Sequence, residues 1–420
     1  MERALLVTIK LNSERDCDWS LEDSALELEE LTGACKVEVV DNITCLRDKP
    51  TPNLFIGKGK AEEIALLCQE EKIDTVIFSH DLSGTQQRNL EEVIGVKTID
   101  RTQLILDIFA RHAKTPEGKT QVALAQLEYL RPRLVGKGIM LSRLGGGVGT
   151  SGPGEQKLEV DRRKIRRMID ILRDDLKQLY LHRQLLRKKR KEKALPSIVL
   201  VGYTNAGKST LLNALTGAGQ VVSDGLFTTL DPLSRSVRLP NGESIIISDT
   251  VGFLHQLPHH LIEAFKATLE EAQEADLLIH VLDVSNPRAL ELSKAVSSVL
   301  KALEVEDKPM ITALNKIDLV EDRVSLNQLY QDHPECVNIS AKLNQNIEEL
   351  LIKVQEKFQS RMVVLEIIIP HRRMDLVDFI HRKGQVKNIQ YEQNGIKISL
   401  NIAKTIAYKL LQDKDVQQVS

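Results

Sequence analysis

The sequence GYTNAGKS at residues 202–209 restricts the possible fold more than any other stretch of this 420-residue chain. It consists of glycine, four further residues, glycine, lysine and serine, and it lies between the apolar run SIVLV and the helix-forming run TLLNAL. In such a loop, backbone N–H groups converge on phosphate oxygens at the N-terminus of a helix. Lys208 would neutralise the β- and γ-phosphates, and the Ser209 hydroxyl would bind Mg²⁺. The spacing therefore predicts a strand, a phosphate-binding P-loop and a helix, in that order.

The apolar runs around and after this loop are short and bounded by turn residues, which is typical of buried parallel strands. They are SIVLV, SIIIS, DLLIHVLD, MITALN and CVNIS. We therefore expect residues 196–360 to form an α/β P-loop domain with a mostly parallel sheet. Residues 1–115 also alternate strand-like and helical runs, and they predict an N-terminal α/β domain. Its expected strands are RALLVTIKL, ACKVEVV and DTVIFSH.

Residues 361–420 predict a small α+β domain. The runs MVVLEIII, VKNIQYE and IKISLNI have strand patterns, and MDLVDFIHR has a helical one. Asn394-Gly395 lies between two of the alternating runs, which is a strong signal for a β-hairpin.

Residues 116–195 predict a long helical hairpin between the two larger domains. KTQVALAQLEYL favours a helix, and the following stretch GKGIMLSRLGGGVGTSGPGE is too rich in glycine for a regular element. Apolar residues then return at a spacing that keeps one seam along a second helix, as in a coiled-coil partner. They are Ile165, Ile169, Leu172, Leu176, Leu179 and Leu186. The glycine-rich loop would form the tip of the hairpin.

Charge is distributed unevenly along the chain, although the formal net charge is only −2. Residues 1–110 contain 12 Lys/Arg against 22 Asp/Glu, whereas residues 131–193 contain 19 against 7. A solvated charged helix face would mix both signs. A segment as basic as this one repels itself unless something neutralises it, so it indicates a polyanionic partner.

Two later motifs favour guanine over adenine. The Asp318 carboxylate of NKID, residues 315–318, can accept hydrogen bonds from guanine N1–H and the 2-amino group, and adenine lacks both donors. Asn315 and Lys316 would brace this loop and cover the base. SAK, residues 340–342, follows the strand-like CVNIS, where a backbone N–H can reach guanine O6.

The motif DTVGF, residues 249–253, completes the set. Asp249 would hold Mg²⁺ through water, and the Gly252 N–H would sense the γ-phosphate. In the preceding stretch DGLFTTLDP, Thr228 and Thr229 both qualify chemically to close over the metal.

Four motifs in this order predict GTP binding with Mg²⁺ as cofactor. The predicted GTP-binding residues are Gly202, Tyr203, Thr204, Asn205, Ala206, Gly207, Lys208, Ser209, Phe227, Thr228, Thr229, Leu230, Asp231, Asp249, Thr250, Val251, Gly252, Asn315, Lys316, Ile317, Asp318, Ser340, Ala341 and Lys342.

We expect a cytoplasmic monomer without an integral membrane segment. No apolar run approaches the ~20 residues that a membrane-spanning helix needs, and the first residues lack a signal-peptide pattern. The five cysteines are scattered and never in CxxC spacing, which argues against a disulfide framework or a zinc site.

The chain resembles the HflX family of ribosome-associated GTPases over nearly its whole length. The matching stretches are FIGKGKAEEI, DLSGTQQRNLE, DRTQLILDIFA, GGGVGTSGPGEQKLEVDRR, LFTTLDP, DTVGF and LPHHLIEAFKATLEEA. In the family's F-x-T-L-D motif the third residue binds magnesium, which implies Thr229. The resemblance also implies that the hairpin reaches toward the peptidyl-transferase region of the large ribosomal subunit, and that GTP drives the splitting of stalled or idle ribosomes.

The resemblance makes the basic hairpin a predicted RNA-binding element. Its glycines would allow close approach to folded RNA while its basic side chains neutralise phosphates. Only Tyr129 and Tyr180 are aromatic in this segment, so base stacking is not expected to dominate. The predicted RNA-binding residues are Arg143, Gly145, Gly146, Gly147, Arg162, Arg163, Lys164, Arg166 and Arg167.

Phe253 stands where many GTPases have a glutamine that orients the attacking water. A benzyl group cannot hydrogen-bond to water, so slow intrinsic hydrolysis is expected. In one interpretation the side chain is simply part of the core. In the other it turns away until a partner supplies or repositions catalytic groups, and the resemblance implies that this partner is the ribosome.

Two other functions stay open from the sequence. The GTPase could assist assembly of the large subunit, with hydrolysis as a release signal. Alternatively, the N-terminal domain could bind a second nucleotide or modify RNA as an enzyme in its own right. His80 and His112 are lone histidines, and GKGK at residues 57–60 lacks P-loop spacing, so no clustered catalytic residues support this last hypothesis.

Overall fold

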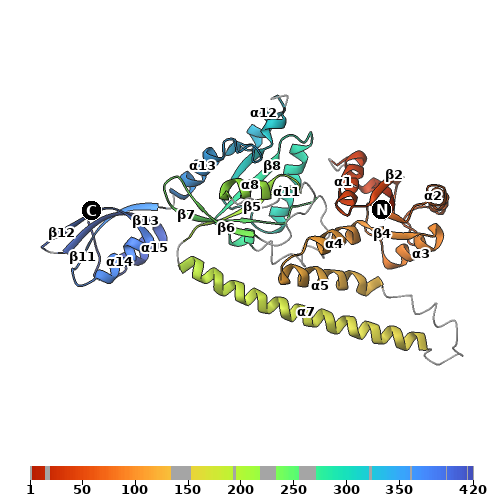
Figure 1. Ribbon diagram of the computed structural model, residues 1–420, viewed down its shortest axis with the longest axis horizontal. Helices are drawn as coiled ribbons and strands as arrows, with labels where there is room; N and C mark the ends of the chain where they lie inside the picture. The colour runs from red at the N-terminus through yellow and green to blue at the C-terminus, as the bar shows by residue number, and fades with distance from the viewer. Residues whose placement is uncertain are drawn as a thin grey trace.

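The computed structural model describes residues 2–14, 19–133, 153–192, 195–217, 233–254, 271–320, 324–359, 362–393, 395–413 and 415–419. Within these ranges three sheets follow one another along the chain, and a long helix runs beside the first two (Figure 1). The predicted fold class is confirmed: an α/β P-loop domain is preceded by an α/β region with a helical hairpin and followed by a small α+β domain. None of the helices in the described ranges is long and apolar enough to cross a membrane.

The N-terminal sheet has four parallel strands in the order β2-β1-β3-β4. They are β1 (Arg3–Leu11), β2 (Glu38–Arg47), β3 (Thr75–Phe78) and β4 (Lys97–Asp100). The connecting helices are α1 (Leu21–Ala34), α2 (Lys58–Glu70), α3 (Gly84–Ile94) and α4 (Arg101–His112), and a 3₁₀ turn covers Asn12–Glu14. Alternate residues of β1 enter two hydrophobic clusters, because helices cover both faces of a parallel sheet.

One predicted strand begins later than expected. The sequence ACKVEVV predicts a strand from residue 34, but β2 begins at Glu38. Ala34 still belongs to α1, and Lys36 adopts a left-handed conformation with φ 56° that turns the chain toward the sheet.

Helices α5 (Pro116–Arg133) and α7 (Pro153–Glu192) pack against each other as a hairpin. With 40 residues, α7 is about 60 Å long at 1.5 Å per residue. Arg173 pairs with Glu128 at 2.6 Å, and Arg183 pairs with Glu117, so ion pairs join the two helices. The predicted seam residues on α7 are buried or half-buried from Ile165 to Leu179, whereas the side chain of Leu186 lies outside the described set. The glycine-rich tip is also outside the described residues.

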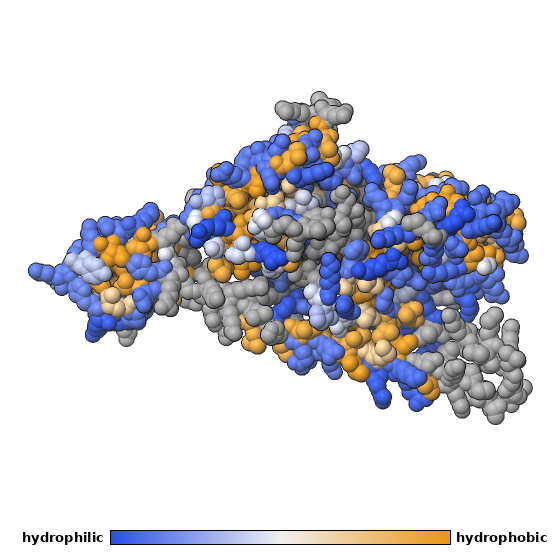
Figure 2. Space-filling view, in the orientation of Figure 1, coloured by the Kyte–Doolittle hydropathy of each residue, from blue (hydrophilic) through white to orange (hydrophobic). Residues whose placement is uncertain are grey.

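A second face of α7 carries exposed apolar side chains among basic ones. They are Val160, Met168, Ile171, Leu181 and Leu185. Figure 2 shows hydrophobic surface interrupted by hydrophilic surface along the lower edge of the molecule, where α7 runs in Figure 1.

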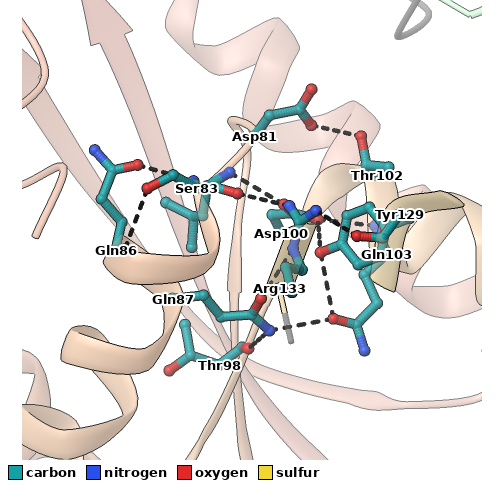
Figure 3. A network of polar contacts seen from close by, with 11 residues as sticks. Asp81, Ser83, Gln86, Gln87, Thr98, Asp100, Thr102, Gln103, Tyr129 and Arg133 are labelled. Atoms are coloured by element: carbon teal, nitrogen blue, oxygen red, sulfur yellow. Dashed lines mark hydrogen bonds and ion pairs between the residues drawn. The ribbon is translucent and has the colours of Figure 1, made fainter. Parts of the chain in front are cut away.

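A polar network holds the end of α5 to the N-terminal sheet (Figure 3). Asp100, buried at the end of β4, accepts hydrogen bonds from the backbone N–H groups of Leu82 (3.0 Å) and Gln103 (2.8 Å). It also accepts from the Tyr129 hydroxyl (2.8 Å) and the Arg133 guanidinium (2.9 Å). Burial raises the pKa of the Asp100 carboxyl, and the Gln103 N–H and Arg133 act in the opposite direction. The C-terminal end of α5, on the tip side of the hairpin, is therefore attached to the sheet by a buried carboxylate.

The P-loop domain has a six-stranded sheet in the order β10-β9-β8-β5-β7-β6, in which only the pair β6/β7 is antiparallel. Its strands are β5 (Ser197–Val201), β6 (Leu233–Arg238), β7 (Ser244–Asp249), β8 (Leu277–Asp283), β9 (Met310–Asn315) and β10 (Cys336–Asn338). Its helices are α8 (Lys208–Thr216), α11 (Ala289–Ala302), α12 (Val324–Asp332) and α13 (Ile347–Gln359), with a 3₁₀ turn, η2, at Ile317–Leu319.

The C-terminal sheet is antiparallel in the order β12-β13-β11-β14. Along the chain the elements are β11 (Met362–Ile369), α14 (Met374–Lys383), β12 (Gly384–Glu392), β13 (Gly395–Ala403), α15 (Lys404–Leu411) and β14 (Gln417–Gln418). This succession is the split βαβ arrangement of ferredoxin-like domains. The predicted hairpin is confirmed by the pairing of Glu392 with Gly395.

One hydrophobic cluster continues from the N-terminal region into the P-loop domain. It includes Leu31 and Phe109 on one side and Val201, Tyr203 and Phe253 on the other. The nucleotide loops therefore lie against N-terminal residues.

Candidate nucleotide-binding site

The P-loop connects β5 to α8 as the spacing predicts. Gly207 precedes the first residue of α8 and has φ 93°, and a Cβ there would lie 2.2 Å from Asn315 Nδ2, so only glycine fits. Lys208 is buried, and its ammonium donates to the carbonyl oxygens of Gly202 (3.1 Å) and Tyr203 (2.7 Å). An ammonium has three N–H donors, so one remains to point at a phosphate.

Burial lowers the pKa of Lys208 to about 8, and the Asp249 carboxylate acts in the opposite direction. A phosphate would likewise favour the charged ammonium. Proton binding and phosphate binding at Lys208 are therefore linked.

Ser209 and Asp249 supply oxygen ligands side by side. Ser209 is on the first turn of α8, Asp249 ends β7, and the Ser209 hydroxyl donates to Asp249 Oδ2 at 2.6 Å. Hydroxyl and carboxylate oxygens are the ligands that Mg²⁺ prefers. This pair fits a magnesium ion held between the serine and the nucleotide phosphates, as in P-loop GTPases generally.

The segment around Gly252 and Phe253 lies directly on the P-loop. The Phe253 N–H donates to Gly202 O (3.1 Å), and the Thr204 N–H donates to Phe253 O (3.0 Å), which forms a parallel bridge. A Cβ on Gly252 would lie 2.8 Å from Thr204 Cα and 3.0 Å from Lys208 Nζ. The Phe253 side chain is 3% exposed in the hydrophobic cluster, so it places no polar group beside the phosphate loop.

The base-recognition loops meet at Asn315, the last residue of β9. Its side-chain Nδ2 donates to Ala206 O (2.8 Å), and its Oδ1 accepts from the Ala341 N–H (3.0 Å). Asn315, Ser340 and Ala341 are buried, whereas Asp318 is exposed on η2. The carboxylate that should recognise guanine is therefore accessible.

Lys316 is held by a residue that the motifs did not identify. Its ammonium pairs with Asp283 at the end of β8 at 2.6 Å, and its backbone has a left-handed φ of 65°. Lys342 is exposed beside these loops. The carboxyl end of a parallel strand is where ligands bind in such sheets, and this rule could have identified Asp283.

A second group of unpredicted contacts comes from α1. The Tyr203 hydroxyl donates to Glu27 at 2.7 Å, and Arg288 pairs with Asp23 at 3.1 Å. Nothing in the sequence spacing signals these contacts, because the partners are far apart along the chain.

Several predicted residues lie outside the described part of the chain. They are Phe227, Thr228, Thr229, Leu230 and Asp231 of the expected nucleotide set, and Arg143, Gly145, Gly146 and Gly147 of the expected RNA set. The remaining basic residues are on α7, where Arg163, Lys164, Arg166 and Arg167 are exposed and Arg162 is half-buried.

Family models match three consecutive regions of the chain. They are "GTP-binding GTPase N-terminal" over residues 22–110, "GTP-binding GTPase Middle Region" over residues 112–190 and "50S ribosome-binding GTPase" over residues 197–316. Among solved structures, a GTP-binding protein from Sulfolobus solfataricus in complex with GDP is 26% identical, with a TM-score of 0.44 over 86% of this chain and 99% of that one.

Curated relatives match at higher identity. The GTPase HflX of Caldanaerobacter subterraneus subsp. tengcongensis is 44% identical over 97% of this chain and 93% of that protein. The GTPase HflX of Lacrimispora saccharolytica is 43% identical over 99% and 96%, and that of Escherichia coli is 38% identical over 96% and 94%. Together with the P-loop geometry, these matches mean that the chain binds and hydrolyses GTP. It belongs to the HflX family of GTPases.

Proposed function

We propose that this GTPase binds the large ribosomal subunit through its N-terminal domain and basic hairpin, and that it splits stalled or idle ribosomes into subunits. The observation that carries the proposal is the row of exposed basic side chains on α7. This helix is about 60 Å long and leads directly toward β5 and the P-loop. The match of residues 197–316 to a family described as a 50S ribosome-binding GTPase supports the same partner.

In the proposed cycle, a cytoplasmic monomer binds GTP with Mg²⁺. Lys208 binds the β- and γ-phosphates, Ser209 and Thr229 hold the metal, and Asp249 supports it through water. Asp318 recognises guanine. Because Phe253 is buried and apolar, the chain alone orients the attacking water poorly, and hydrolysis stays slow until the large subunit supplies or repositions the missing groups.

Single-turnover GTP hydrolysis tests the activation. Purified large subunits should raise the rate by at least about 100-fold, since partner-supplied groups in other GTPases contribute 10³–10⁵. Small subunits should have no such effect, and Lys208→Ala should abolish the activity. Fast hydrolysis by the chain alone, or no response to large subunits, would contradict the proposal.

Sucrose-gradient sedimentation separates splitting from the alternative role in large-subunit assembly. Splitting predicts that intact ribosomes shift to subunits when GTP or a non-hydrolysable analogue is added. Assembly predicts binding to immature large subunits and unchanged intact ribosomes.

The hairpin can be tested by removing exposed charge from α7. Arg163→Ala combined with Arg167→Ala should weaken binding to large subunits and make the salt dependence shallower, by about one unit for each phosphate that the variant no longer neutralises. Lys294→Ala combined with Lys301→Ala removes two exposed charges from α11 in the P-loop domain and is the matched control. Equal effects of the two changes would exclude the hairpin as the RNA-binding element.

A further inference from the structure

Helix α1 presents three carboxylates to the nucleotide-binding loops. Asp23, Glu27 and Glu30 are spaced by four and three residues, which places them on one face of the helix. Asp23 pairs with Arg288, whose guanidinium also lies 5.0 Å from the ring centre of Trp19. The three carboxylates therefore face the edge of the P-loop domain where the phosphate and base loops are located.

Glu30, which is exposed, interacts electrostatically with charged residues of the nucleotide-binding loops. Partial burial, and next the Glu27 carboxylate, raise its pKa, whereas Arg288 and Lys316 act in the opposite direction. Lys316 is the lysine of NKID, so Glu30 interacts electrostatically with the base-recognition loop.

Glu27 is the central contact. The residue is 8% exposed, and both of its carboxylate oxygens accept from Arg101 at 3.2 Å. The Tyr203 hydroxyl donates a further bond to Oε1 at 2.7 Å. A carboxylate so buried is stable only when charged and polar partners surround it. Glu27 therefore holds the Tyr203 hydroxyl directly, and Arg101 holds Glu27.

Tyr203 is itself part of the P-loop. Its carbonyl oxygen accepts from the Lys208 ammonium at 2.7 Å, and its backbone forms the bridge to Phe253. A displacement of the Tyr203 ring would therefore disturb both the phosphate-binding lysine and the DTVGF segment.

The contact continues from Glu27 to the hairpin. Arg101 is the first residue of α4 and directly follows Asp100. Asp100 in turn binds Tyr129 and Arg133 of α5, as Figure 3 shows. Two sets of polar contacts, linked through the consecutive residues Asp100 and Arg101, thus connect the C-terminal end of α5 to the phosphate loop.

We infer that Glu27 is a positioning residue for the P-loop, and that the Tyr203–Glu27–Arg101 network makes nucleotide release depend on the position of the N-terminal domain. This inference deepens the GTPase activity, and only its use by a ribosomal partner rests on the proposed function. An RNA that moves the hairpin would change nucleotide retention through this network.

The test is the dissociation rate of a fluorescent GDP analogue from the intact chain. Tyr203→Phe removes only the hydroxyl, and Glu27→Gln keeps the shape but removes the charge. Each should accelerate release about five-fold or more, the lower end of typical coupling between sites. The double variant should release no faster than the faster single variant, because both substitutions act on the same hydrogen bond: Tyr203→Phe removes its donor, and Glu27→Gln replaces its charged acceptor by a neutral one. Glu29→Gln, on the exposed side of α1, is the matched control and should release at the wild-type rate.

A second readout separates positioning from general loss of structure. The ratio of GDP to inosine diphosphate affinity should stay at the wild-type value, because Asp318 is not displaced. If Glu27→Gln lowers the melting temperature strongly, the release rate of Tyr203→Phe tests the inference alone, because that substitution leaves the Glu27–Arg101 pair intact. Two results would overturn the inference. One is a GDP release rate of Tyr203→Phe within about 1.5-fold of the wild-type rate. The other is a double variant whose acceleration equals the product of the two single accelerations, because the two substitutions would then act independently.

Large subunits provide the final arm of the experiment. Their addition should change the release rate of the wild type and have a smaller effect on Tyr203→Phe. If the variants alter release without subunits but subunits never alter it, the network stands and the proposed ribosomal function fails.

Discussion

The side-chain amide of Asn315 donates a hydrogen bond to the carbonyl oxygen of Ala206 over 2.8 Å, which attaches the end of β9 to the phosphate loop. The other end of the same side chain accepts from the Ala341 N–H. One buried residue thus joins a loop that lies 109 positions before it to another that lies 26 positions after it.

Asn315→Asp should weaken GDP binding and lower stability. The carboxylate can still accept from Ala341, but it cannot donate to Ala206, and it places a charge against a carbonyl oxygen. We expect a loss of about 2–3 kcal/mol in binding free energy, as for a buried hydrogen bond left unsatisfied. Titration calorimetry with GDP measures it. Asn327→Asp, on the exposed side of α12, is the control, and an equal loss there would contradict a specific role for Asn315.

GDP affinity should fall as the pH rises above about 8. Burial lowers the pKa of Lys208 from 10.5 to about 8 in the folded chain, whereas phosphates favour its charged form. Binding therefore takes up a proton above this pH, and the logarithm of the association constant should decrease by up to about one unit per pH unit. Calorimetry in two buffers of different ionisation enthalpy would detect the proton. Lys208→Arg keeps its charge and should show no such slope.

The lowered pKa of Lys208 should make the nucleotide-free chain more stable as the pH rises, although it weakens GDP binding. Between pH of about 8 and 10.5 the unfolded chain holds a proton on Lys208 that the folded, nucleotide-free chain has released. The contribution of Lys208 to the free energy of unfolding should therefore increase with pH in this window. Denaturant titrations of wild type and Lys208→Met at pH values across the window should differ in slope, and identical slopes would mean that Lys208 titrates normally.

Asp318→Asn should change the preferred base without affecting stability. The amide can donate to the C2 carbonyl of xanthine but no longer accepts two hydrogen bonds from guanine. We expect GDP affinity to fall by about 2–4 kcal/mol and xanthosine diphosphate to bind more tightly than GDP. Competition against a fluorescent nucleotide measures both. Because Asp318 is exposed, the melting temperature should stay unchanged, and a large decrease would indicate a structural role instead.

Asp100→Asn should loosen the attachment of the C-terminal end of α5 to the N-terminal sheet. The substituted amide can accept only part of the four hydrogen bonds at Asp100 and leaves Arg133 without its buried counter-charge. Breaking a buried pair costs about 3–5 kcal/mol. Urea unfolding should show this loss, and hydrogen exchange should increase in α5. Asp41→Asn, exposed on β2, should be neutral, and a neutral Asp100→Asn would show that the network contributes little.

The sequence predicts the structure best where a functional motif and the local hydrophobic pattern indicate the same elements. The P-loop needs a strand, a glycine at positive φ and a helix, and β5, Gly207 and α8 occur as expected. The local pattern does not indicate β4, because this strand has only four residues, one of them aliphatic. It does not indicate β6 either, because this edge strand alternates apolar and polar residues weakly. The domain limits and the ligand roles of the site residues stay predictions.

Contacts between distant segments could not be predicted at all. Glu27 precedes Tyr203 by 176 positions, and a buried glutamate in an amphipathic helix has the same local pattern as an exposed one. For Phe253, the sequence leaves open whether it is a core residue or a displaced switch. Its burial is compatible with both interpretations, because the same hydrophobic cluster that packs the benzyl group also holds it away from the phosphate loop.

Because α7 is long, a small rotation at one of its ends produces a large displacement at the other. The helix ends at Glu192, and β5 begins at Ser197 and leads into the P-loop. For a rigid rod of about 60 Å, a tilt of only about 5° at one end displaces the other by about 5 Å. This displacement is larger than the length of a hydrogen bond, which is about 3 Å. A rotation that is small at Glu192, next to the P-loop domain, therefore moves the other end of α7, at Pro153, far enough to make or break contacts.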